Sequence, residues 1–513
     1  MSNLNLNPNK DLMDLKTRPS SKNIQRLAIA NRGEVAVRII KACEELGIQT
    51  ILLHSEPDVN SKAYRMADYK ICIGAAPTQS SYLNIKANIQ AALAMGADAI
   101  HPGFGFLSEN ADFAKACVES GMIFVGPSEE TIRQLGDKVN FKKLAKQAGL
   151  PLIPGYEGAD QSIEKLLEEV SKIGLPVIVK AAAGGGGRGM KLIKEINEAK
   201  PLIESAKREA LSAFGSDIVF LEKYLDRAKH IEFQIFGDSI GQVKHLFDRE
   251  CSVQRRHQKI IEEANSAFLT NELRNKMGDV AAKIGKLGNY KGAGTVEFLL
   301  QDNQFYLLEV NTRLQVEHPV TEEVLGIDLV KMQILTAQEK FIFDPNDVLI
   351  PKGHSIECRV YAEDPYNGGV PSTGLLGTVQ WPEGPFRRFE FGFEKGDTIT
   401  SYYDPMIAKV IVWDENRQRA IQKMIKVLTD SIVFGVHTNI PYLIEILSHP
   451  EFLDGTMSTR FIEKHFPDGL PKAKFPVISK KESQKYYKQS LFIKNDLELN
   501  LTQDPWNQYF RGV

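Results

Sequence analysis

The segment that most constrains the fold is IQRLAIANRGEVAVRIIKACEELGIQTILLHSE, residues 24–56. A short β-prone run at 27–30 leads into a glycine turn and an amphipathic helix that continues to about Leu46. Gly47 then precedes a second strand at 49–54. Two strands joined through one helix pair in parallel. The segment therefore predicts a βαβ unit with a parallel sheet.

The following residues continue this alternation of helix and strand. A helical pattern at 85–95 precedes the strand-like DAIH at 98–101 and the loop HPGFGFLSEN, so the predicted doubly wound domain ends near Lys138. The turn ANRGE lacks the GxGxxG pattern and is typical of a plain strand-to-helix turn. No dinucleotide site is predicted from it.

Length, charge and cysteine content limit the classes of protein that this chain can belong to. Its 513 residues predict about three domains. A net charge of -2 favours neither nucleic acid nor an anionic membrane as a partner, and five scattered cysteines without a CxxC pair argue against disulfides and structural zinc. No stretch approaches the ~18 apolar residues of a membrane-spanning helix. We therefore expect a cytoplasmic protein without nucleic-acid or membrane partners.

Two β-rich stretches, GAGTVEFLLQ and QFYLLEVN, flank a turn and predict a hairpin. A three-residue loop at 302–304 would place Glu297 directly opposite Glu309. Like charges in this position destabilise a strand pair unless a cation lies between them. A two-residue turn at 302–303 would instead shift the register by one and turn the two glutamates to opposite faces.

The stretch LEVNTRLQVEHP alternates polar and apolar residues. If 308–318 is extended, one face carries Glu309, Asn311, Arg313, Gln315 and Glu317. Such alternation is most often a half-buried strand with a solvated polar face. The paired glutamates favour a second interpretation, since oxygen ligands from Glu297, Glu309 and Asn311 suit Mg²⁺.

A magnesium site usually serves a nucleotide, and nucleotide phosphates require cations. The candidates are Lys138, Lys180, His230 and Lys259, although most lysines are simply solvated surface residues. KAAAGGGGRGM is not a P-loop, because GxxxxGK[ST] needs lysine and then serine or threonine. Its glycines at 184–187 fit either a flexible spacer or a backbone surface for phosphate.

Several long motifs appear in order between about residues 25 and 466. They are IANRGEVAVRI, HPGFGFLSEN, GDKV, KAAAGGGGRGM, FLEKYL, ECSVQRRHQKIIEEAN, GAGTVEF, EVNTRLQVEHPVTE and ECRVYAEDP. Together they resemble biotin carboxylase, the ATP-grasp subunit of biotin-dependent carboxylases, and most of all the subunit that serves acetyl-CoA carboxylase in fatty acid biosynthesis.

The resemblance implies an α/β fold of three domains. We expect a Rossmann-like N-terminal domain at 25–138, an ATP-grasp domain at 139–352 with a mobile lid at about 152–224, and a mixed α+β C-terminal domain at 353–468. A disordered extension at 1–24 and a tail at 469–513 flank them. In the family the glycine segment is a hinged lid hairpin over the phosphates, so 184–187 are expected to be among the least ordered core residues without nucleotide.

The resemblance also assigns roles to individual residues. Contacts with ATP are implied for Lys138, Lys180, Gly186, Gly187, Met190, Glu222, Lys223, Tyr224, Leu225, His230, His257, Lys259, Glu297 and Glu309. Metal ligation is implied for Glu297, Glu309 and Asn311, and binding of bicarbonate or biotin for Arg313, Gln315, Val316 and Arg359. The implied catalytic residues are Arg313, Glu317 as the base that deprotonates bicarbonate, Arg359 as the arginine that stabilises the biotin enolate, and Lys259.

The implied reaction is an ATP-dependent ligation. Biotin carboxylase uses ATP, Mg²⁺ or Mn²⁺, and bicarbonate to carboxylate biotin on a carrier protein through carboxyphosphate. The expected partners are a biotin carboxyl carrier protein and carboxyltransferase subunits, because the sequence has no biotinyl MKM segment and no carboxyltransferase region. A homodimer is also expected. The final acceptor stays open among acetyl-CoA, propionyl-CoA, methylcrotonyl-CoA and pyruvate.

Alternatives and departures from the family pattern complete the prediction. Another ATP-grasp ligase, such as a carbamoyl-phosphate synthetase half or a purine-pathway carboxylase, or an inactive scaffold subunit, would share part of the pattern. The family commonly has tyrosine where this chain has Phe104, and Ala183 replaces one of five glycines. Cys251 is interpreted as a packed cysteine rather than a catalytic thiol. Aromatic residues of the tail, Trp506, Tyr509 and Phe510, are predicted to dock a partner.

Overall fold

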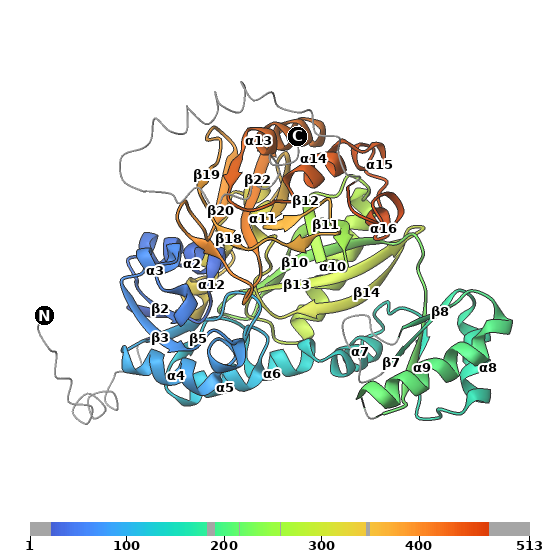
Figure 1. Cartoon of the computed structure of the whole chain (residues 1–513). Coiled ribbons are helices and arrows are strands. Elements are labelled where there is room, and N and C mark those ends of the chain that lie inside the picture. Colours follow the sequence, from blue (N-terminus) through green and yellow to red (C-terminus); the bar gives the residue numbers. More distant parts are fainter. Residues whose placement is uncertain (1–21, 182–189, 215, 257, 345–348, 471–513) are drawn as a thin grey trace, which may run out of the picture.

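The computed structural model describes residues 22–181, 190–214, 216–256, 258–344 and 349–470. Within them, three sheets of four or more strands are assembled with helices on their faces (Figure 1). The predictions about the N-terminal extension, the tail and the glycine run at 184–187 lie outside or largely outside these residues. No helix of the described part is both long and apolar enough to cross a membrane.

The N-terminal region forms a five-stranded sheet of order β3-β2-β1-β4-β5, and its strands pair in parallel. Its elements are β1 (Arg26–Ile29), α2 (Gly33–Glu45), β2 (Gln49–Ser55), α3 (Lys62–Met66), β3 (Tyr69–Gly74), α4 (Ile85–Ala94), β4 (Ala99–His101), α5 (Ala111–Glu119), β5 (Ile123–Phe124) and α6 (Glu129–Thr131). Gly47 has φ of 68°, in the left-handed region that glycine adopts at little cost, and turns the chain from α2 into β2. The predicted βαβ unit and doubly wound fold are confirmed.

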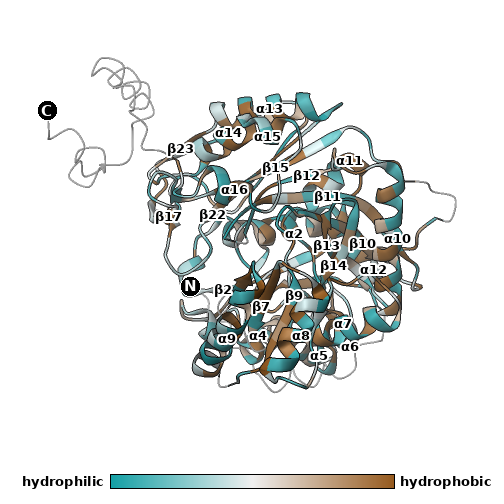
Figure 2. Cartoon of the chain, turned by 90° about the vertical axis from the view of Figure 1, so that its right-hand side faces the viewer, coloured by the Kyte–Doolittle hydropathy of each residue, from teal (hydrophilic) through white to brown (hydrophobic). Residues whose placement is uncertain are grey.

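A second, four-stranded sheet of order β6-β9-β7-β8 lies to one side of the molecule, and helices α8 and α9 pack against it (Figure 1). Its elements are β6 (Gly155–Tyr156), α8 (Ile163–Ile173), β7 (Val177–Ala181), β8 (Lys191–Ile193), α9 (Ala199–Phe214) and β9 (Val219–Lys223), and α7 (Lys138–Gln147) precedes them. Leu166 and Val170, one turn apart on α8, pack with Val177 and Val179 in a fully buried core. The hydrophobic colouring of β7 and β9 in Figure 2 marks this core.

The largest sheet has eight strands in the order β14-β13-β10-β11-β12-β15-β22-β20. Its first part contains β10 (Lys229–Gly237), β11 (Val243–Arg255), β12 (Gln258–Ala264), α10 (Asn271–Leu287), β13 (Gly292–Gln301), β14 (Gln304–Asn311), α11 (His318–Leu325) and α12 (Leu329–Ala337). β12 pairs with β15 (His354–Tyr361), so the sheet continues across the domain boundary predicted near 352.

The remaining elements of the C-terminal region extend the sheet and cover it. They are β16 (Glu363–Asp364), β17 (Val370–Pro371), β18 (Gly374–Leu375), β19 (Thr378–Gln380), β20 (Arg387–Phe391), β21 (Thr398–Ile399), β22 (Met406–Asp414), α13 (Arg417–Asp430), β23 (Ile432–Phe434), α14 (Ile440–Ser448), α15 (Pro450–Leu453) and α16 (Phe461–His465). α13 and α14 pack buried apolar residues, among them Ile421, Met424 and Leu443, against β15 and β22.

The hairpin turn differs from the predicted three-residue loop. Gln301 pairs with Gln304 across a two-residue turn, in which Asp302 and Asn303 both have positive φ, 53° and 62°. A register shift then occurs between Phe298 and Glu297, so that Leu308 is an extra residue of β14 and Glu297 still pairs with Glu309. The predicted pairing is confirmed although the predicted loop length is wrong.

The extended conformation considered for 308–318 holds only as far as Asn311. β14 ends at Asn311, an irregular segment follows, and α11 begins at His318 with Glu317 at its N-cap position. Pro319 in the first turn favours this helix start. The polar side chains therefore converge through a loop instead of sharing one face of a strand.

Candidate active site

Four charged residues lie side by side on adjacent strands of the large sheet. Arg249 on β11 pairs with Glu232 on β10, Glu232 pairs with Glu297 on β13, and Glu297 pairs with Glu309 on β14. Three neighbouring carboxylates of like charge destabilise a sheet unless cations compensate them. Arg249 donates to Glu232 at one end of the row, and the remaining carboxylates require positive charge from elsewhere in the molecule.

Lys259 on β12 supplies the central positive charge. Its Nζ lies 2.8 Å from Glu297 Oε1 and 2.8 Å from Glu317 Oε1, and it also donates to Glu232. Burial alone would lower the pKa of Lys259, but these three carboxylates raise it well above its usual value. The ammonium group is therefore charged at every physiological pH.

Glu297 is held ionised by its surroundings. Burial would raise the pKa of Glu297, but Lys259 and His230 lower it far below its usual value. His230 Nε2 lies 3.2 Å from Glu297 Oε2, and Asn311 Nδ2 donates to Glu297 Oε1 at 2.9 Å. Glu297 and Asn311, two of the three predicted metal ligands, are in direct contact.

The third predicted ligand, Glu309, borders a small cavity. Its Oε2 lies 3.2 Å from Lys138 Nζ, and a cavity of about 210 Å³ beside them is lined by Glu109, Lys138, Glu309 and Asn311, among others. Two carboxylates on paired residues, with an amide oxygen next to them, provide the hard oxygen donors that Mg²⁺ prefers. The residues present therefore fit a divalent cation.

Arg313 crosses from the large sheet to the N-terminal region. Its Nε donates to Glu109 Oε2 at 2.8 Å, and its two Nη atoms donate to Gln315 Oε1 at 2.9 Å and Asn311 Oδ1 at 3.1 Å. Val316, which follows Gln315, offers its carbonyl to Lys409 Nζ at 2.8 Å. These contacts fix the loop that connects β14 to α11.

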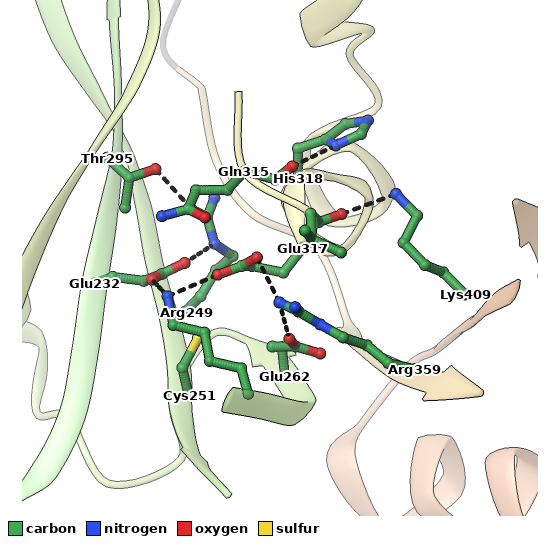
Figure 3. A network of polar contacts seen from close by, with 12 residues as sticks. Glu232, Arg249, Cys251, Glu262, Thr295, Gln315, Glu317, His318, Arg359 and Lys409 are labelled. Atoms are coloured by element: carbon green, nitrogen blue, oxygen red, sulfur yellow. Dashed lines mark hydrogen bonds and ion pairs between the residues drawn. The ribbon is translucent and has the colours of Figure 1, made fainter. Parts of the chain in front are cut away.

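Glu317 lies between two cations, Lys259 and Arg359, and Figure 3 shows its contact with Arg359. Lys259 contacts one of its oxygens, and Arg359 Nη2 donates to the other at 2.9 Å. Burial would raise the pKa of Glu317, but Lys259, Arg359 and Arg249 together lower it well below its usual value. Arg359 Nη2 also lies 2.5 Å from Glu262 Oε1. Four predicted residues, Lys259, Glu297, Glu317 and Arg359, thus form one buried network.

The predicted nucleotide contacts on the four-stranded sheet form a second group. Glu222 on β9 accepts from Lys180 on β7 and, at 2.7 Å, from Lys142 Nζ on α7. Lys223 donates to the carbonyls of Gly174 and Leu175. Of the other residues expected to bind ATP, Tyr224 and Leu225 follow β9 and Met190 precedes β8, while Gly186, Gly187 and His257 lie outside the described residues.

Several charged residues of the network were missed by sequence reasoning. Glu232 lies two residues after His230, so strand alternation was a usable signal for it. Glu109, Arg249, Glu262 and Lys142 gave no such signal, because tertiary packing alone brings them to the site. Cys251 is fully buried, and burial raises its thiol pKa well above the usual value, as expected of a packed cysteine.

Comparison with known families covers nearly all of the described chain. Residues 23–132 match the N-terminal domain of biotin carboxylase, residues 137–342 the ATP-binding domain of the carbamoyl-phosphate synthase L chain, and residues 357–464 the C-terminal domain of biotin carboxylase. Biotin carboxylase of Nostoc sp. is 46% identical over 440 residues, which cover 86% of this chain and 98% of that protein. The chain belongs to the biotin carboxylase family. This family consists of ATP-dependent ligases of the ATP-grasp type.

Other biotin carboxylase family members extend this similarity. The mitochondrial methylcrotonoyl-CoA carboxylase subunit alpha of Dictyostelium discoideum is 45% identical over 454 residues, 88% of this chain, and the chain spans 64% of that subunit. The biotin carboxylase domain dimer of Hydrogenobacter thermophilus 2-oxoglutarate carboxylase, solved with MgADP, ADP and bicarbonate, has a TM-score of 0.80 and 43% identity, covering 86% of this chain and 98% of that chain. The three-domain biotin carboxylase architecture predicted for this chain is confirmed.

Proposed function

We propose that this chain catalyses the ATP-dependent carboxylation of biotin on a carrier protein, with bicarbonate as the carboxyl source and carboxyphosphate as the intermediate. The observation that carries the proposal is the buried position of Glu317 between Lys259 and Arg359, beside the carboxylate row and the Arg313 loop. The bicarbonate and MgADP bound to the Hydrogenobacter thermophilus relative support it.

In the proposed mechanism, cations of three elements, α7, β7 and β12, bind the nucleotide phosphates. The charges for this role are carried by Lys138, Lys180 and Lys259. Lys180 must exchange its contact with Glu222 for a contact with nucleotide. Glu297 and Glu309, with Asn311 beside them, would hold Mg²⁺, which neutralises charge between the β- and γ-phosphates when bound. Manganese fits the same oxygen donors.

Bicarbonate is a poor nucleophile, so its activation falls to the loop before α11. The planar guanidinium of Arg313 suits bidentate binding of a carboxylate-like anion, with Gln315 and the backbone of Val316 next to it. Glu317 is placed to accept the proton of bicarbonate. Closure of the four-stranded sheet over the site would exclude water, which otherwise hydrolyses carboxyphosphate.

The test is ATP hydrolysis by the purified chain. We expect hydrolysis to require bicarbonate and Mg²⁺ and to increase when free biotin is added. An inactive nucleotide-binding or scaffold subunit would bind ATP without bicarbonate-dependent turnover. That result would reject the proposed activity and leave the family membership unchanged.

For the final acceptor we propose acetyl-CoA, which makes this half-reaction the first step of fatty acid biosynthesis. The alignment covers 98% of the Nostoc biotin carboxylase, and this nearly full-length match to a protein named biotin carboxylase supports the proposal. The Dictyostelium relative favours methylcrotonoyl-CoA as the second candidate. Carboxylation of each acyl-CoA by the native complex, measured with labelled bicarbonate, decides between them.

We further propose a homodimer in the cytoplasm, with a biotin carrier protein and a carboxyltransferase as partners. The domain dimer of the Hydrogenobacter thermophilus relative supports the first part. Sedimentation of the purified chain and fractionation of native cells test the dimer and the location. A monomer at assay concentration, or a particulate fraction, would contradict them.

A further inference from the structure

Two buried glutamates lie directly behind Glu317. Glu262 on β12 and Glu357 on β15 are paired residues on adjacent strands, and both side chains are fully buried. Two ionised carboxylates in this position would repel each other in a medium of low polarity. At least one of them must therefore be neutral or share a cation.

Arg359 is the cation that Glu262 shares. A single guanidinium nitrogen, Nη2, lies 2.5 Å from Glu262 Oε1 and 2.9 Å from Glu317 Oε2 (Figure 3). Within the described chain the carboxylate oxygens of both glutamates lack a hydrogen bond of ordinary geometry, so it is the ion pair with Arg359 that distinguishes Glu262 from Glu357. Arg359 therefore lies between two carboxylates that can both bind it, those of Glu262 and Glu317, and it does not contact Glu357.

The charges around the pair make Glu262 the carboxylate that responds to pH. Burial raises the pKa of Glu262 to about 7, while Arg359 acts to lower it and Glu317 to raise it. Burial raises the pKa of Glu357 well above its usual value, although Lys409 acts to lower it. The titratable and charged groups that face the pair are Arg359, Cys358 and Tyr361 on β15, Cys251 on β11, Lys259 on β12, Lys409 on β22, and Glu317.

Glu317 needs such a competitor if it is to act as a base. With both oxygens bound by cations, its pKa is held well below the usual value, and so weak a base removes a proton slowly. Lys259 cannot leave easily, because Glu232 and Glu297 also require it. Arg359 can move toward a second carboxylate that it already contacts.

We propose that Glu262 is a positioning residue for bicarbonate activation: it competes with Glu317 for the Arg359 guanidinium and holds that guanidinium when Glu317 accepts a proton. In the step, the O–H bond of bicarbonate breaks, its electron pair stays on the resulting carbonate, and a new O–H bond forms on Glu317. Arg359 then pairs with ionised Glu262, so no buried cation is left alone. This inference rests on the proposed biotin carboxylase activity.

The experiment compares Glu262→Gln with wild type in biotin carboxylation across a pH series. Glutamine keeps the shape but removes the competing charge, so Arg359 remains on Glu317. We expect kcat to fall by about tenfold or more, which is part of the ~10²- to 10⁴-fold that a general base contributes, with KM for ATP changed less than about twofold. The acidic limb of the profile should move to lower pH, because Glu317 becomes a weaker base.

Glu357→Gln is the matched control, since it makes the same change in the paired buried residue without a contact to Arg359. Its profile should match wild type. If Glu262→Gln does not fold, Glu262→Asp keeps the charge at greater distance and should give a smaller shift in the same direction. A wild-type profile for the folded Glu262 variant, or an equal loss in both glutamine variants, overturns the inference. Inactive wild type would instead reject the proposed function.

Discussion

Arg313 is the residue at which the large sheet and the N-terminal region meet. It contacts Glu109 from one side and Asn311 and Gln315 from the other, so its guanidinium is fixed before any substrate arrives. Burial would lower the pKa of Arg313, but Glu109 raises it above the usual value. A charge fixed in this way is suited to orient an anion.

We predict that Arg313→Ala abolishes biotin carboxylation and spares nucleotide binding. Removing a preorganised charge from a buried site costs about 10²-fold or more in kcat. Carboxylation assays and calorimetric titration with MgADP measure the two properties separately. Loss of MgADP binding together with activity would assign Arg313 to another role or to the fold.

We predict that Glu297→Gln raises the concentration of Mg²⁺ needed for half-maximal activity. The amide removes one of two ionised carboxylates, and each charged ligand contributes to divalent cation affinity. A titration of activity against Mg²⁺ at saturating ATP measures this. An unchanged magnesium requirement would show that Glu297 is no ligand and serves Lys259 alone.

The site residues that could be predicted from the sequence are those that lie on one hairpin or within one motif. Glu297 and Glu309 were found through hairpin pairing, and their pairing is confirmed. Glu262 and Glu109 were missed because they lie on other segments of the chain, and only the packing of β12 and the N-terminal loop brings them to Arg359 and Arg313. A contact between two residues that are far apart in the chain produces no periodic pattern in a single sequence.

At the scale of elements, Lys142 connects helix α7 to the four-stranded sheet. Lys142 on α7 reaches Glu157 and Glu222, and Glu222 also binds Lys180. Lys142 thus connects α7 to the sheet and shares the Glu222 carboxylate with a predicted phosphate ligand. This arrangement leaves Lys180 less tightly held than it would be in an exclusive pair.

We predict that Lys142→Met raises KM for ATP by about threefold to tenfold and changes kcat less. Without Lys142, Glu222 binds Lys180 alone, and transfer of Lys180 to nucleotide becomes less favourable by roughly 1 kcal/mol. Lys143→Met, at the exposed neighbouring position, is the control. Equal effects of the two substitutions would indicate a general loss of α7.

In the hairpin of β13 and β14, the turn could be predicted from the sequence but the irregularity in strand pairing could not. Both the turn and the irregularity at Leu308 are short-range features, yet only their combination fixes the register. Turn residues with positive φ at Asp302 and Asn303 were readable as a two-residue turn. The compensating extra residue was not, because Leu308 differs in no local property from its neighbours.

At the scale of the whole molecule, Glu263 links the two parts of the large sheet. It lies on β12 and binds His354 Nε2 on β15, at 2.7 Å, and Arg417 on α13, whose Nε and Nη2 donate to its two oxygens. Burial would raise the pKa of Glu263, but His354 and Arg417 lower it to about 2. The contact stabilises the folded state only while Glu263 is ionised.

We predict that Glu263→Gln lowers stability at neutral pH by roughly 3 kcal/mol, the equivalent of its pKa shift. The folded pKa is depressed, so this contribution is complete above the unfolded value of about 4.3 and is lost as pH falls toward about 2. Thermal unfolding of both proteins at neutral and acidic pH measures the difference. A gap that stays constant with pH would contradict the ionic explanation.

The eight-stranded sheet determines where this chain can be divided in the laboratory. A break between α12 and β15 would separate β12 from β15 and leave each fragment with a bare strand edge of unpaired backbone groups. Such edges recruit other chains, so each fragment is expected to aggregate when expressed alone. Shorter versions of the protein for crystallisation or labelling should therefore keep residues 229–414 together.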